Sequence, residues 1–104
     1  MLSNKVDKLV LKAFLENKVP EVLRREDADL AKRIGDDMLS YANRLLMGRN
    51  ETIEILKLPL ISKEDKVQVN NMISRIESET EKRDLIFFYR LVILAETIIY
   101  KYIA

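Results

Sequence analysis

The stretch that decides the fold is Leu85–Ala104, LIFFYRLVILAETIIYKYIA, which favours a helix and is apolar on more than one face. A surface helix of a small domain normally carries one apolar stripe slightly wider than about 100°. Here roughly half of the circumference is continuously apolar, and it is formed by Leu85, Phe87, Phe88, Leu91, Val92, Ala95, Ile98, Ile99, Tyr102 and Ile103. A second apolar strip lies beyond Glu96 and consists of Ile86, Tyr89, Ile93 and Tyr100. Such a helix must be covered by its own domain, by a second copy or by a partner.

The composition predicts one folded domain, residues 1–104. Apolar residues make up 48% of the chain and charged residues 34%, which is typical of a globular protein and not of a disordered one. With 18 basic and 17 acidic side chains the net charge is +1, so no overall field attracts nucleic acid or an anionic membrane. Lys, Arg, Glu, Ile and Leu are abundant and glutamine occurs once, at Gln68, a balance that resembles thermophile proteins.

The absence of two residue types narrows the chemistry. The chain has no cysteine, hence no disulfide, thiolate metal site or thiol nucleophile. It has no histidine either, which removes the commonest general base and the commonest transition-metal ligand. An Mg²⁺ site remains conceivable at Glu51 and Glu54, one helical turn apart, but no second E-x-x-D pair follows them. We therefore expect no cofactor, no metal and no enzymatic activity.

The sequence also predicts a protein outside the membrane. The N-terminal residues 1–18 are charged and amphipathic, unlike a signal peptide. Arg90 and Glu96 fall inside the apolar C-terminal stretch, and two central charges cost about 5–7 kcal/mol on insertion scales. That cost roughly cancels the gain from the apolar residues, so we expect a cytoplasmic protein.

Helix signals run through the whole chain and predict an all-α bundle of four or five helices. A first helix spans about residues 5–16, capped by Asn4, with an apolar face formed by Val6, Leu9, Val10, Ala13 and Phe14. A second stretch runs from Pro20, as first helical residue, to about Met47, with a kink near Asp27. Its core positions are Leu30, Ile34, Met38, Tyr41 and Leu45. Gly35 in the middle of this stretch predicts a close packing contact, and Gly48 would end it.

The second half of the chain carries one open question. Residues 50–57 fit a short helix better than a strand, and Pro59 ends them. Ser62 caps the next helix, whose core is Val67 or Val69 with Met72, Ile73 and Ile76. The polar run at residues 77–84, ESETEKRD, allows either a hairpin near residues 78–80 or one helix of about forty residues, and the poor heptad pattern favours the hairpin.

Two surfaces are candidates for binding. The first is the C-terminal helix, where we predict a protein interface at Phe87, Tyr89, Arg90, Glu96, Tyr100, Tyr102 and Ile103. Glu96 shares a stripe with two tyrosines. It is either solvated at the edge of the apolar face or buried and paired with a tyrosine hydroxyl or an arginine of another helix or subunit.

The second candidate surface is a basic line on the second helical stretch. It would contact nucleic-acid phosphates through Arg24, Arg25, Lys32, Arg33, Arg44 and Arg49. Interleaved acids would cancel much of its field, and Lys32 with Asp36 and Arg33 with Asp37 are spaced as surface ion pairs.

The preferred interpretation is therefore a small non-enzymatic interaction subunit. It would self-associate or dock on a larger protein through its C-terminal helix, by analogy with helical subunits of nucleic-acid-processing assemblies such as those of replication. A helical DNA- or RNA-binding protein that uses the basic line is the alternative.

Overall fold

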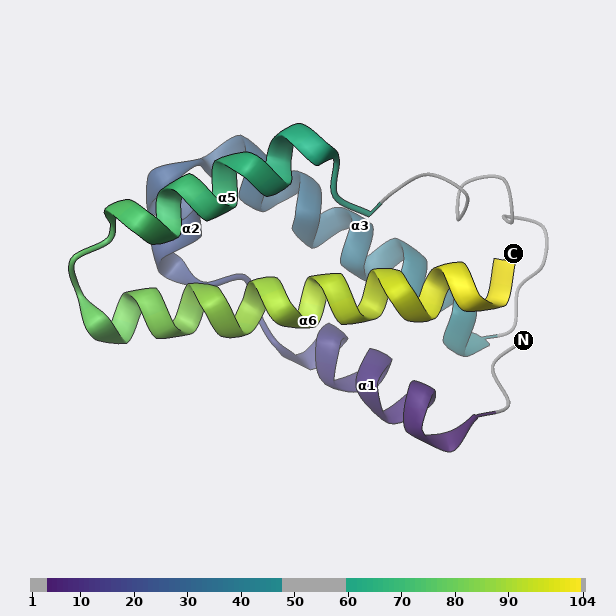
Figure 1. Cartoon of the computed structure of the whole chain (residues 1–104). Coiled ribbons are helices and arrows are strands. Elements are labelled where there is room, and N and C mark those ends of the chain that lie inside the picture. Colours follow the sequence, from purple (N-terminus) through teal and green to yellow (C-terminus); the bar gives the residue numbers. More distant parts are fainter. Residues whose placement is uncertain (1–3, 48–59, 104) are drawn as a thin grey trace.

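The computed structural model describes residues 4–47 and 60–103, and these form five α-helices without a strand. The helices are α1 (Lys5–Glu16), α2 (Glu21–Glu26), α3 (Ala28–Met47), α5 (Lys63–Arg75) and α6 (Glu79–Ile103). Helix α6 crosses the whole molecule, with α5 along one side of it and α1 along the other, while α2 and α3 lie behind (Figure 1). The predicted all-α bundle is confirmed.

Helix α6 is the central element because its inner face packs against the other four helices of the described ranges. The fully enclosed side chains on this face follow helical spacing, and they are Leu85, Phe88, Val92, Ala95 and Ile99. Leu11 and Phe14 of α1 and Leu23 of α2 are buried to the same degree. A continuous apolar core therefore runs between the front layer of α5, α6 and α1 and the layer behind it.

The second helical stretch is broken into two helices at Asp27. The backbone of Asp27 leaves the helical conformation, with φ −153° and ψ 87°, and its Oδ1 accepts a hydrogen bond from the Leu30 amide at 3.1 Å. The side chain thus caps α3, so the expected kink is a full break between α2 and α3. Pro20 directly precedes the first residue of α2 and is not that residue itself, a shift of one position from the prediction. The predicted core positions of α3 are all buried.

Helix α1 is rotated from the predicted orientation. Asn4 caps it by accepting from the amides of Val6 and Asp7, as expected. The side chains of Val6 and Leu9, however, are 64% and 58% exposed, whereas Asp7 is buried. The physical reason is that Leu11 and Phe14, one and two turns after Asp7, are fully buried, so the Asp7 side of α1 faces the core. An ion pair of 3.0 Å between the Asp7 carboxylate and the Lys101 ammonium of α6 accompanies this packing.

The hairpin between α5 and α6 is confirmed. Helix α5 ends at Arg75 and α6 begins at Glu79, with the amide of Glu81 donating to the Ser78 hydroxyl at 3.3 Å. Ser62 caps α5 by accepting from the Asp65 amide at 3.1 Å. Of the two alternatives for the core of α5, Val69 is buried and Val67 is exposed.

Several sequence predictions fall on residues 48–59, outside the described residues. They are the helix end at Gly48, the short helix at residues 50–57, its end at Pro59, the carboxylates Glu51 and Glu54, and the basic residue Arg49. In the described residues, no helix combines the length and the hydropathy that a membrane-spanning segment needs.

Gly35 sits where α3 passes the segment before α2, and it offers a test of packing. A Cβ placed on Gly35 would lie 3.4 Å from Cγ2 of Val19, an ordinary van der Waals distance. Gly35→Ala should therefore fit and should stabilise the protein by up to about 1 kcal/mol, because alanine favours a helix over glycine by that amount. Urea unfolding of both proteins measures the difference.

Gly35→Ile serves as the comparison, since its branched Cβ carries two further carbons toward the same contact. We expect this variant to be less stable than Gly35→Ala. Equal stability of the two variants would contradict the described proximity of Val19.

Candidate functional site: the outward face of the C-terminal helix

Glu96 is the buried charge of α6. It is only 6% exposed, and its two carboxylate oxygens have different partners within the chain. One oxygen accepts from the Ile61 amide at 3.2 Å and the other from the Lys66 ammonium at 2.8 Å. The buried alternative for Glu96 is thus confirmed, with a lysine and a backbone amide in place of the expected tyrosine or arginine. Because these partners occupy it, Glu96 is not available to the predicted interface, and that assignment is corrected.

Among the described residues, three further ion pairs join helices that are distant in the sequence. Besides the pair of Asp7 with Lys101, Arg33 of α3 reaches Asp65 of α5 at 2.8 Å, and Arg25 of α2 reaches Glu81 of α6 at 2.7 Å. The hydrogen bond from Arg25 lowers the pKa of the Glu81 carboxyl, and the hydrogen bond to Glu96 raises the pKa of Lys66. The three carboxylates that are buried among the described residues, Asp7, Asp65 and Glu96, are all bound within the chain, so these charges hold helices together.

The opposite side of α6 is turned to solvent. We call it the outward face, and it comprises Phe87, Arg90, Leu94, Thr97 and Tyr100. The exposed fractions are 58% for Phe87, 45% for Leu94 and 38% for Tyr100, which are large for apolar side chains. Burial raises the pKa of the Tyr100 hydroxyl, with a further contribution from the Glu96 charge.

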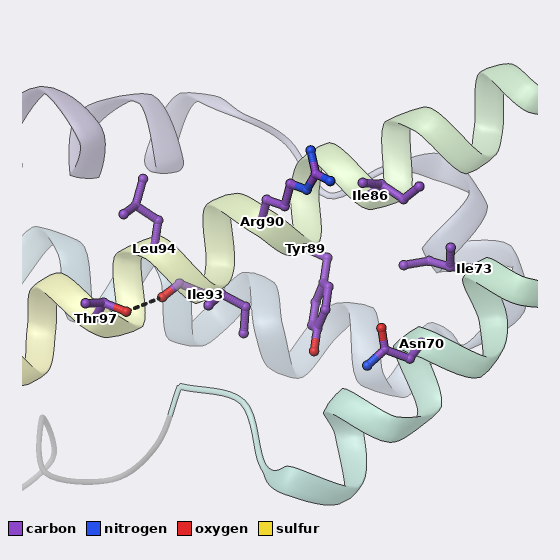
Figure 2. Close-up of a pocket in the computed structure, with 8 residues that line it drawn as sticks. All are labelled: Asn70, Ile73, Ile86, Tyr89, Arg90, Ile93, Leu94 and Thr97. Atoms are coloured by element: carbon purple, nitrogen blue, oxygen red, sulfur yellow. Dashed lines mark hydrogen bonds between the residues drawn. The ribbon is translucent and has the colours of Figure 1, made fainter.

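A groove runs between α5 and this face. We call it the α5–α6 groove, and it has a volume of about 530 Å³. Its lining residues are Asn70, Ile73, Ile86, Tyr89, Arg90, Ile93, Leu94 and Thr97. Figure 2 shows Tyr89 directed from α6 toward Asn70 on α5, and Leu94 and Arg90 directed away from α5. The walls are mainly apolar, and the Thr97 hydroxyl is satisfied by donating to the Ile93 carbonyl at 3.0 Å.

The structure brings together part of the predicted interface. Phe87, Arg90 and Tyr100 are exposed, and Tyr89 is half-buried against the core while lining the groove. The side chains of Tyr102 and Ile103 lie outside the described part of the chain.

The prediction missed Leu94 and the contribution of α5. Leu94 lies seven residues after Phe87 and therefore on the same side of the helix, a spacing that could have revealed it. Asn70 and Ile73 carry no comparable signal, because only the tertiary packing of α5 on α6 places them in the groove.

The predicted basic line is divided by the fold. Arg25 and Arg33 are engaged in the interhelical ion pairs, and Arg33 pairs with Asp65 and not with the expected Asp37. Arg24 and Lys32 line a separate groove of about 360 Å³ that also contains Asp36. Arg44 is half-buried with one enclosed guanidinium nitrogen. Among the described residues, these side chains therefore form no continuous cationic surface.

Metal ligation finds no support in the described ranges, 4–47 and 60–103. They hold no group of three or more histidine, cysteine, aspartate or glutamate side chains close enough to share an ion.

Comparisons of the chain with protein-family models, curated proteins and solved structures gave no match. The choice among candidate functions therefore rests on the geometry of the described residues.

The ion pair of Lys66 with Glu96 should matter most to stability. Lys66→Met leaves the buried Glu96 carboxylate with the Ile61 amide as its remaining partner, and breaking a buried pair in this way costs about 3 kcal/mol. Urea unfolding should show this loss for the single variant. The double variant Lys66→Met, Glu96→Leu should recover part of it, because no buried charge is left. A change below about 0.5 kcal/mol in the single variant would contradict this account.

Stability should fall in alkali. The hydrogen bond to Glu96 raises the pKa of Lys66, and burial raises the pKa of Tyr41 above its usual value of 10.0. The folded protein thus holds these protons more tightly than the unfolded chain, so stability is complete below about pH 10 and declines as the pH rises through the raised values.

Urea midpoints at several values between about pH 8 and pH 11 measure this decline. Tyr41→Phe keeps the buried ring and removes the titrating hydroxyl, so it should make the decline shallower. A midpoint that stays constant or rises over this range would contradict the expected direction.

Proposed function

We propose that this protein is a small non-enzymatic interaction subunit that binds another protein surface through the outward face of α6. The observation that carries the proposal is the α5–α6 groove, whose apolar walls continue into the exposed side chains of Phe87, Leu94 and Tyr100. Exposed apolar surface that borders a groove is typical of protein interaction sites. Covering it with a partner would remove that surface from water.

The remaining side chains support binding over catalysis. General acid–base chemistry needs a titratable group free to exchange a proton with a substrate. The chain has no histidine or cysteine. Within residues 4–47 and 60–103, the three buried carboxylates, Asp7, Asp65 and Glu96, are each held in an ion pair. These carboxylates stabilise the packing of the helices. The groove is therefore better suited to contact with another protein than to catalysis.

Binding to nucleic acid is less well supported than binding to protein. Phosphate contacts need several cations that are free to approach the backbone. Arg25 and Arg33 already have carboxylate partners, and Lys32 shares its groove with Asp36. No observation on the described residues favours this function over the proposed one.

The proposal is tested on the outward face with a matched control. Phe87→Asp and Leu94→Asp should weaken the binding of an apolar fluorescent dye, and should dissociate any oligomer that forms through this face, because each places a carboxylate there. Leu39→Asp changes a leucine on α3 that is 59% exposed and should leave both properties unchanged. Light scattering after size exclusion, at low and high salt, measures the mass, and dye fluorescence measures the apolar surface.

Stability provides the second readout of this experiment. Substitutions at exposed positions usually change the free energy of unfolding by no more than about 0.5 kcal/mol, so helical circular dichroism and the melting temperature should persist. If both variants unfold, these side chains belong to the core. If they behave like Leu39→Asp, the outward face is not the interaction surface.

A further inference from the structure

The charge of the α5–α6 groove indicates the chemistry of its partner. Of the eight residues that line it, only Arg90 is charged, and none is acidic. Arg90 is exposed and has no ion-pair partner among the described residues. A partner that covers the apolar walls would take water from this guanidinium, and an opposing carboxylate would compensate for that loss.

The acids of α6 leave the positive charge of Arg90 uncompensated. Between Arg83 and Lys101 the helix contains two acids, Asp84 and Glu96. Glu96 is buried and bound to Lys66, and Asp84 lies about 120° away from Arg90 around the helix. Arg83 stands two turns before Arg90 on the same side and adds a second exposed cation.

This distribution of charge disfavours a second copy as the occupant. A two-fold dimer brings the same patch of both subunits together. Each copy would then place Arg90 against a surface that is apolar or cationic, with no exposed carboxylate among the lining residues. Like charges facing each other at an interface are destabilising.

The shape of the groove favours a helix over a flat lipid surface. The lining residues on α6 extend from Ile86 to Thr97, a length of about 16 Å at the rise of an α-helix. That length matches about three turns of a partner helix, which would place apolar side chains at spacings of three, four and seven residues along the walls. A membrane surface does not fill a concave groove of this kind.

We infer that the α5–α6 groove binds an acidic amphipathic helix of another protein, with its apolar stripe against Ile86, Ile93 and Leu94 and a carboxylate facing Arg90. This inference rests on the proposed function and names the class of partner. In this complex Arg90 selects the partner by its charge, and the apolar walls bind the apolar stripe of the partner helix.

Two synthetic peptides provide the test. Both are 18-residue amphipathic helices with the same leucine stripe, and one carries glutamate where the other carries lysine. We expect the acidic peptide to bind the full chain about tenfold more tightly than the basic one at low salt, with a smaller difference at high salt. Fluorescence anisotropy gives the dissociation constants, and amide chemical shifts locate the contact on α5 and α6.

Variants connect the preference to the groove. Arg90→Glu should remove the preference for the acidic peptide, whereas the control Arg24→Glu, an exposed arginine on α2, should retain it. Leu94→Asp should weaken binding of both peptides. Equal affinity for the two peptides, or equal behaviour of Arg90→Glu and Arg24→Glu, would overturn the inference. Preferential binding to anionic phospholipid vesicles, with both peptides unbound, would overturn it as well.

The two proposals fail differently. A stable homodimer that Leu94→Asp dissociates would show that the outward face is used and that its occupant is a second copy, so only the present inference would fail. A monomer that binds neither peptide, and whose apolar surface Leu94→Asp does not change, would reject both.

Discussion

The buried carboxylate of Glu96 determines how α5 stands against α6. A charge in the core is tolerated only when strong donors surround it, and here the donors are the Ile61 amide and the Lys66 ammonium. Lys66 lies in the first turn of α5 and Ile61 in the segment just before it, so satisfying Glu96 brings that end of α5 to the C-terminal half of α6. Toward the other end, the short turn between Arg75 and Glu79 limits the separation of the two helices. The α5–α6 groove lies between these two attachments.

Helix α6 acts as both core and surface because its apolar residues exceed what its neighbours cover. In the part of the chain that the structure describes, four helices contact it and bury a continuous inner stripe that includes Leu85, Val92 and Ile99. Phe87 and Leu94 lie on the other side of the same helix and remain exposed. Amphipathic helices normally place polar residues there. The apolar outward face is therefore a property of the sequence that the fold itself does not require.

Local signals were sufficient to predict much of the fold. Asn4 and Ser62 cap α1 and α5, and the core spacing of α3 and the polar turn before α6 appear in the structure as the sequence predicts. The rotation of α1 was not predictable, since the side that buries Leu11 and Phe14 depends on the packing of α1 against α3 and α6. The partner of Asp7 on that side, Lys101, is 94 residues away. The partner of Glu96 escaped prediction for the same reason. Periodicity reports which residues share a side of one helix, whereas these interactions depend on which helices meet.

The two central charges of α6 lie on different sides of the helix, one buried and one exposed. This difference links the fold to the proposed binding. Glu96 and Arg90 are six residues apart and so lie about 120° apart around the helix, one toward α5 and the core and the other toward solvent. The inward carboxylate is neutralised by Lys66 within the chain. The outward guanidinium of Arg90 lies among apolar side chains. A partner without a carboxylate would remove water from this charge and offer no ion pair in return. One charge thus fixes the position of the groove, and the other restricts what can occupy it.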